Sequence, residues 1–230
     1  MTINGWSVAN ANAKQWNVRR GYASITNQSE WIAGSYNPAF FSGKAGFKTL
    51  QVVLIVKAGS KETVQAGISM ILSKLKDPAE IVLENYVRKF YGILRSYSAE
   101  EITQRRTTPF HKLTLNLEGY EFDSEITASG QNLITANNPG TLLTPAIVTV
   151  SATRAVSNIT ISGLGEAIVL KNVLANKQYV INGENGLITV DGALANVDIW
   201  NLPVLQPGNN TVTCSESTAT VTIRYKPRYM

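Results

Sequence analysis

The stretch Phe47–Pro78, FKTLQVVLIVKAGSKETVQAGISMILSKLKDP, decides the fold of the first half of the chain. Its opening part, Phe47–Lys57, is rich in β-branched residues that favour an extended backbone. In such a backbone the apolar side chains fall on both faces: Leu50, Val52, Leu54 and Val56 on one, Val53 and Ile55 on the other. This pattern predicts a strand that is largely buried on both sides and therefore lies inside a sheet.

The residues that follow predict a single amphipathic helix. Ser60 is a good N-cap residue, and Glu62 places a negative charge at the positive end of the helix dipole. Apolar residues then recur every three to four positions, at Val64, Ile68, Ile71, Leu72 and Leu75. Lys74 and Lys76 lie near the end, and Asp77–Pro78 stops the helix because proline cannot continue its hydrogen bonding. One helix beside a sheet indicates a compact α+β unit.

Two further segments extend this sheet. Ile81–Glu84 and Arg88–Leu94 flank Asn85–Tyr86, an arrangement that favours a hairpin. The segment His111–Phe122 alternates between apolar and polar residues and is predicted to be the closing strand of the first domain.

The second half of the chain consists of short apolar runs separated by turn residues such as Gly183–Gly186, Asp191–Gly192 and Pro207–Asn210. Seven such runs occur, at Ala146–Ser151, Ile159–Ser162, Ala167–Leu170, Tyr179–Ile181, Leu187–Val190, Thr211–Cys214 and Thr220–Tyr225. Evenly spaced strands without a helical stretch predict a β-sandwich or jelly roll.

Between the two halves, Thr127–Pro145 is rich in Ser, Thr, Asn, Gly and Pro. Its centre, Ala136–Gly140, is not expected inside a strand or a helix, so it is interpreted as a linker. The expected domains are residues 1–135 and 136–230. The fold class is mainly β with one helix: an N-terminal α+β, sandwich-like domain and a C-terminal β-sandwich.

Composition narrows the class of protein. With 44% hydrophobic and 16% charged residues the chain is expected to fold, and a net charge of +5 without a strong basic cluster argues against nucleic-acid binding. The single cysteine, Cys214, allows no internal disulfide. No uninterrupted apolar stretch is long enough to span a membrane, and we expect synthesis and folding in the cytoplasm.

No motif predicts catalysis. His111 is the single histidine and stands at the start of an alternating strand, without a nucleophile or carboxylate at a recognised spacing. One histidine and one cysteine cannot form an ordinary zinc site within one chain. We therefore expect no enzyme, no catalytic or metal-binding residues and no cofactor.

Two groups of aromatic residues are candidates for binding. Trp31, Tyr36, Phe40 and Phe41 lie in an irregular segment among Gly, Asn, Ser and Pro. Such a segment either folds back on its own core or packs against a neighbouring subunit. In the second domain, Trp200 and Tyr179 are candidates for stacking on a sugar, although the residues around Trp200 favour core packing.

The order and spacing of several segments resemble the distal tail proteins of siphophages and prophages. In the first domain the resemblance rests on Phe47–Lys57 with Ala58–Glu62, on Phe90–Leu94 and on Leu115–Phe122. In the second it rests on Pro145–Val150, Ile181–Glu184, Val190–Gly192, Leu205–Thr211 and Ile223–Tyr229.

This resemblance implies a virion tail protein that is assembled in the host cytoplasm. N-terminal domains would form a homo-hexameric ring, and C-terminal galectin-like sandwiches would project outward. The ring would join the tail tube protein on one side to fibre, baseplate or receptor-binding proteins on the other, and DNA would only pass through its channel. The alternative is a carbohydrate-binding β-sandwich module that recognises a host surface.

Overall fold

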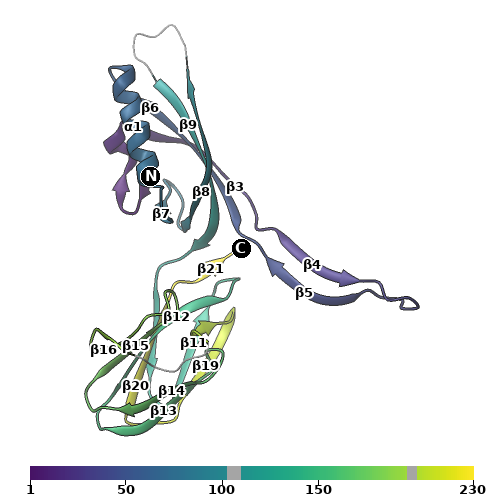
Figure 1. The fold of residues 1–230 in the computed structure, drawn as a ribbon, viewed down its shortest axis with the longest axis vertical. Helices are drawn as coiled ribbons and strands as arrows, with labels where there is room; N and C mark the ends of the chain where they lie inside the picture. Colours follow the sequence, from purple (N-terminus) through teal and green to yellow (C-terminus); the bar gives the residue numbers. More distant parts are fainter. Residues whose placement is uncertain (103–109, 196–200) are drawn as a thin grey trace. The chain divides into compact units, whose positions relative to one another are not determined.

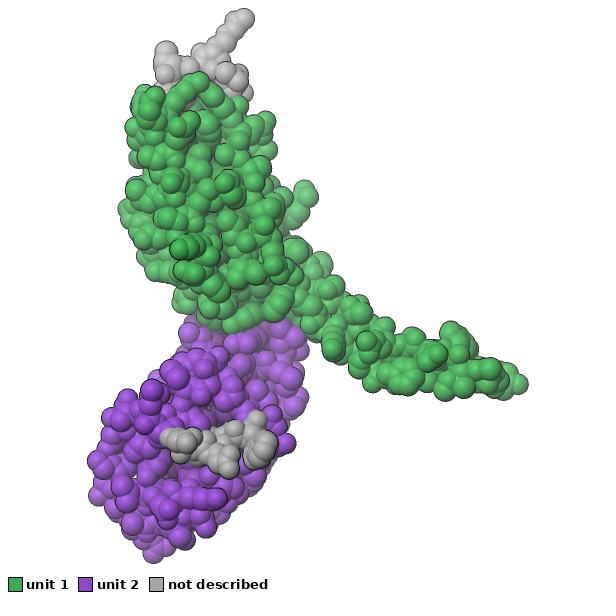
Figure 2. All heavy atoms as spheres, in the orientation of Figure 1, with its two compact units in different colours: residues 1–122, 230 green, residues 123–229 purple. Residues whose placement is uncertain are grey.

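The structure is a computed structural model that describes residues 1–102, 110–195 and 201–230. Its contacts divide the chain into two compact units (Figures 1 and 2). Unit 1 comprises residues 1–122 together with Met230, and unit 2 comprises residues 123–229. Within the described ranges, no helix is both long and apolar enough to cross a membrane.

Unit 1 is built on an antiparallel sheet with the strand order β2-β1-β7-β8-β9-β6-β3. These strands are β1 Thr2–Ile3, β2 Trp6–Ser7, β3 Ala13–Arg20, β6 Lys48–Lys57, β7 Ala79–Val82, β8 Lys89–Glu101 and β9 Phe110–Phe122. The predicted strand at 47–57 is confirmed as β6, and the predicted hairpin is confirmed as β7–β8. The strand predicted to close the first domain is confirmed as β9, the last strand of unit 1 along the chain, and it lies in the sheet between β8 and β6.

The predicted helix is confirmed as α1, Lys61–Ser73, and lies against one face of this sheet (Figure 1). The Ser60 hydroxyl accepts a hydrogen bond from the Thr63 amide at 3.2 Å, as expected of an N-cap. A short 3₁₀-helix, η1 Val8–Ala11, packs beside α1. A Cβ on Gly67 would lie 2.6 Å from the Ala11 carbonyl oxygen, so glycine is what permits this close approach.

Unit 2 is a β-sandwich, as predicted. One sheet has the order β10-β20-β12-β15-β16-β17, with β18 beside β12, and the other has the order β11-β19-β13-β14. The strands of the two sheets are β10 Ile126–Gly130, β11 Leu133–Asn138, β12 Thr144–Ala152, β13 Val156–Ser162, β14 Ile168–Val173, β15 Gln178–Asn182, β16 Ile188–Val190, β17 Ala193–Leu194, β18 Val204–Leu205, β19 Gly208–Cys214 and β20 Ala219–Tyr225. A last short strand, β21 Arg228–Tyr229, belongs to neither sheet of the sandwich. Alternate residues such as Val148, Ile161 and Ile223 are fully buried in its core.

The predicted domain boundary after residue 135 is wrong. β10 pairs with β20, and β11 pairs with β19, so residues 123–135 belong to the sandwich. The supposed linker Ala136–Gly140 begins inside β11, and Asn138 is fully buried, with its amide donating to the Thr144 hydroxyl at 3.1 Å. Polar composition was misleading here because the Asn side chain is satisfied by hydrogen bonds inside the unit instead of by water. The boundary lies between Phe122 and Asp123.

Candidate subunit interface

Between β3 and β6 the chain leaves the sheet as a two-stranded hairpin, here called the arm (residues 25–45). Its strands are β4 Ile25–Glu30 and β5 Ala39–Ala45, and within the described part of the chain they pair only with each other. Figure 2 shows the arm as a narrow projection of unit 1. At its root, the Gly21 amide donates to the Thr49 carbonyl at 2.8 Å and the Gly46 amide donates to the Ser24 carbonyl at 2.7 Å.

The four aromatic residues predicted as a subunit interface all lie on this arm. Trp31 and Tyr36 belong to the connection between β4 and β5, and Phe40 and Phe41 belong to β5. Their exposures are 68%, 96%, 65% and 63% in the same order. None of them folds back on a core, so the first of the two expected alternatives is wrong. The sequence did not indicate that they stand on a hairpin.

A bulge in the arm displays the two phenylalanines. Gln28 pairs with Ser42, but Ser29 pairs with Phe40, so Phe41 is an extra residue without a partner in the opposite strand. Such a bulge re-aims the side chains beside it. The Phe40 ring lies over Gly43, where a Cβ would come within 3.4 Å of it.

The arm has little to stabilise it in isolation. A single two-stranded hairpin is at best marginally stable in water. Residues 31–43 contain no charged side chain, while Glu30 and Lys44 flank them. A projecting, uncharged and aromatic surface of this kind is a candidate site of protein interaction.

The root of the arm, in contrast, is firmly held. The buried Glu121 carboxylate accepts from Arg20 Nη1 and from Lys48 Nζ, each at 2.9 Å. Lys48 is itself buried, and the Arg20 guanidinium lies 4.4 Å from the centre of the Tyr86 ring. These contacts fix the ends of β3 and β6 where the arm leaves the sheet.

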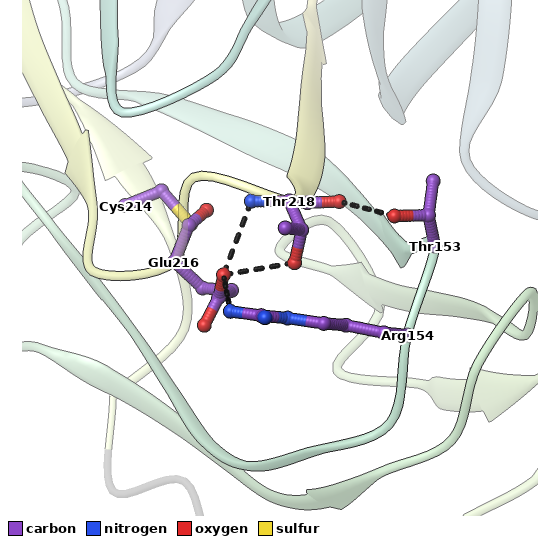
Figure 3. A network of polar contacts seen from close by, with 5 residues as sticks. All are labelled: Thr153, Arg154, Cys214, Glu216 and Thr218. Carbon is purple, nitrogen blue, oxygen red and sulfur yellow. Dashed lines mark hydrogen bonds and ion pairs between the residues drawn. The ribbon is translucent and has the colours of Figure 1, made fainter.

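In unit 2, polar side chains gather at the turn between β19 and β20 (Figure 3). The Glu216 carboxylate accepts from the Thr218 amide at 3.1 Å, from the Thr218 hydroxyl at 2.8 Å and from Arg154 Nη2 at 3.2 Å. The Thr218 hydrogen bonds, with Arg154 beside them, lower the pKa of Glu216. Cys214 is buried, and its Sγ donates to the Glu216 carbonyl at 3.6 Å. The network thus stabilises this turn and joins it to Arg154, in the connection between β12 and β13.

Of the two residues predicted as candidates for glycan contact, the structure describes one. Tyr179 lies in the sandwich core at 7% exposure, and its hydroxyl accepts from the Leu174 amide at 3.0 Å. Its ring therefore offers no face to a sugar. Trp200 lies outside the described residues. Across the ranges that the structure describes, no three His, Cys, Asp or Glu side chains are grouped so as to hold a metal ion.

Residues 139–229 match the family described as the siphovirus-type tail component, C-terminal domain. Most of unit 2 is thus similar to a siphovirus-type tail component domain, which is the class of protein that this match indicates. No curated protein matches the sequence.

Solved structures extend the likeness to unit 1. The Dit protein of SPP1, described as a paradigm of the hub adsorption apparatus in phages that infect Gram-positive bacteria, has the same fold with a TM-score of 0.73 and 16% identity. The similarity covers 99% of this chain and 98% of that one. A chain of the phage P2 baseplate in its activated conformation with Ca has a TM-score of 0.52, 12% identity and coverages of 95% and 92%. The resemblance to siphophage distal tail proteins is confirmed.

Proposed function

We propose that this chain is a structural protein of a phage or prophage tail and that its copies form a closed ring, with six as the expected number. The ring joins the distal end of the tail tube to the tip or baseplate and its receptor-binding proteins. It is assembled in the host cytoplasm, needs no cofactor, catalyses no reaction and lets DNA pass through its channel. The observation that carries the proposal is the fold shared with SPP1 Dit along 99% of the chain.

The edges of the unit 1 sheet support ring closure. Among the described residues, β3 pairs only with β6, and β7 covers β8 only at Phe90–Gly92. The outer edges of β3 and of Ile93–Glu101 are therefore free of a neighbouring strand in the single chain. Unpaired edges of this length are sites where another chain can add its own strand.

The directions of these edges suit a ring. The four strands β8, β9, β6 and β3 follow one another in antiparallel fashion, so the two free edges run in opposite directions. Copies related by rotation about an axis along the strands would present antiparallel edges to each other. Such a contact joins different faces of identical subunits, as closed rings require.

The arm supplies the second contact. Its aromatic side chains are of the types that dominate binding energy at protein interfaces. We propose that Trp31, Tyr36, Phe40 and Phe41 are covered by a neighbouring subunit in the ring, where a stable interface would bury on the order of 1,200 to 2,000 Å².

The test is the assembly state of the purified protein by light scattering coupled to size exclusion, with tail tube protein added where closure needs it. We expect about six chains for the natural sequence, and a monomer when the four aromatic residues of the arm are changed to Ser. The matched control is Val87→Ser, which removes an equally exposed apolar side chain of unit 1 and should leave the ring intact. A strict monomer or dimer of the natural chain under all these conditions, with no ring in electron micrographs, would overturn the proposal.

A further inference from the structure

A groove of about 490 Å³ opens on unit 1 beside the root of the arm. The side chains that line it on the sheet face away from α1 are Arg19, Thr49, Gln51, Arg95, Asn116 and Glu118. Their strand positions alternate with Leu50 and Leu117, which are buried in the core. The groove is therefore a feature of the uncovered sheet face.

Hydrogen bonds hold the walls of this groove in place. Gln51 Nε2 donates to Asn116 Oδ1 at 3.0 Å, and Asn116 Nδ2 donates to the Ser96 hydroxyl at 3.0 Å. Arg95 is ion-paired with Glu118. Because this partner is already on the same wall, the Arg95 guanidinium is oriented before anything binds, which reduces the entropy lost on binding.

The chemistry of the groove suits aromatic rings. Arginine guanidinium groups stack on aromatic faces, and they do so without needing a charged partner on the other side. Arg20 already lies over Tyr86 in this way, on the opposite face of β3, where it pairs with the buried Leu50. On the groove face, Arg19 and Arg95 offer guanidinium groups of the same kind.

The matching surface on the chain is the connection between β4 and β5, which is aromatic and uncharged. It cannot reach the groove of its own chain. β4 alone, Ile25–Glu30, spans roughly 20 Å at about 3.3 Å per residue, and it carries Trp31 and Tyr36 away from the root at which the groove lies. A second copy of the chain can supply this segment because each copy has one arm and one groove.

We propose that the arm of one copy binds in the Arg19–Arg95 groove at the root of the next copy's arm, with its aromatic rings stacked on the guanidinium groups. This inference rests on the proposed ring and names the surface that receives the arm. Each subunit then gives one arm and receives one, which is a head-to-tail contact that closes with the ring.

Cysteine cross-linking between two differently labelled chains tests the contact. One chain carries Tyr36→Cys and the other carries Thr49→Cys, while Cys214 stays because it is buried. In the assembled ring, we expect a short bismaleimide to cross-link the two cysteine variants to each other. With the natural chain, which has neither new cysteine, we expect little cross-linked product. The matched control replaces Thr49→Cys by Ser73→Cys on α1, which should not cross-link to the arm.

Substitution of the two groove arginines tests the same contact independently, through its effect on assembly. Arg19→Ala with Arg95→Ala should raise the concentration needed for assembly about tenfold, whereas Arg19→Lys with Arg95→Lys should recover only part of the loss because an ammonium group lacks the flat stacking surface. Rings that assemble normally with the double Ala variant, and that show no Tyr36→Cys to Thr49→Cys product, would overturn this inference but leave the proposed function intact. The absence of any ring from the natural chain would count against the proposed function itself.

Discussion

At the scale of single residues, Glu216 links the stability of unit 2 to pH. The Thr218 hydrogen bonds hold the pKa of this carboxyl below its ordinary value. A carboxyl whose pKa is lower in the folded state stabilises the fold above its unfolded pKa, and this contribution is lost as the pH falls through the folded value.

Glu216→Gln should therefore lower the thermal stability of the protein at neutral pH, and the difference from the natural chain should shrink as the pH falls below about 4.5. Differential scanning calorimetry between pH 3 and 7 measures this difference. Glu184→Gln is the control, because the Glu184 carboxylate is partly exposed and, among the described residues, its one ion pair is long, at 3.9 Å. If Glu216→Gln lowers the thermal stability as much at pH 3 as at neutral pH, the stabilising role given to the ionised Glu216 carboxylate is wrong.

A second residue-scale prediction concerns the buried ion pair at the root of the arm. Glu121→Gln leaves the Lys48 ammonium buried without a negative partner, which should cost about 3–5 kcal/mol in free energy of unfolding. Glu118→Gln, at a more exposed ion pair, should cost at most about 1 kcal/mol. Urea unfolding followed by tryptophan fluorescence in a Trp200→Phe background reports unit 1, where the other three tryptophans lie. Equal losses of unfolding free energy for the two substitutions would argue against a special stabilising role of the buried Glu121–Lys48 ion pair.

At the scale of elements, the N-cap of α1 makes its own contribution to the stability of unit 1. Ser60→Ala removes the hydroxyl that accepts from Thr63 and should lower the free energy of unfolding of unit 1 by about 1 kcal/mol. Ser73→Ala, at the other end of the same helix, should change it by less than about 0.5 kcal/mol because its hydroxyl bonds only to the Met70 carbonyl. The same fluorescence measurement applies, and a larger loss for Ser73→Ala would show that the cap is not what stabilises the first turn.

At the scale of the whole molecule, the revised boundary predicts which fragments fold. Residues 123–229 include all the strands of the sandwich and should give a cooperative thermal transition on their own. Residues 136–230 lack β10 and half of β11, which leaves one edge of each sheet uncovered, and they should be unfolded or aggregated. Circular dichroism with temperature compares the two. A well-folded 136–230 fragment would restore the boundary expected from composition.

Local patterns sufficed for the elements whose neighbours in sequence are also their neighbours in space. The helix was predictable from the Ser60 cap, the apolar repeat and Pro78, because all of these signals act within a few residues. The β7–β8 hairpin was predictable for the same reason. Seven strands of the sandwich were predictable from their own apolar runs and the turn residues between them, although these signals did not show which strands pair. The aromatic residues of the arm could be singled out as an interaction surface, since apolar side chains among Gly, Asn, Ser and Pro stand out in any context.

By itself, then, the sequence determined the fold class, the helix, most strands of the sandwich and the resemblance to distal tail proteins. The tertiary structure alone decided that β9 is central, that residues 126–138 pair with β20 and β19, and that Trp31 to Phe41 stand on a projecting hairpin. The physical reason is that strand pairing joins residues far apart in the chain, such as Ala128 and Ile223. Whether Asn138 lies in water or in a core depends on those distant partners, and no local pattern contains them.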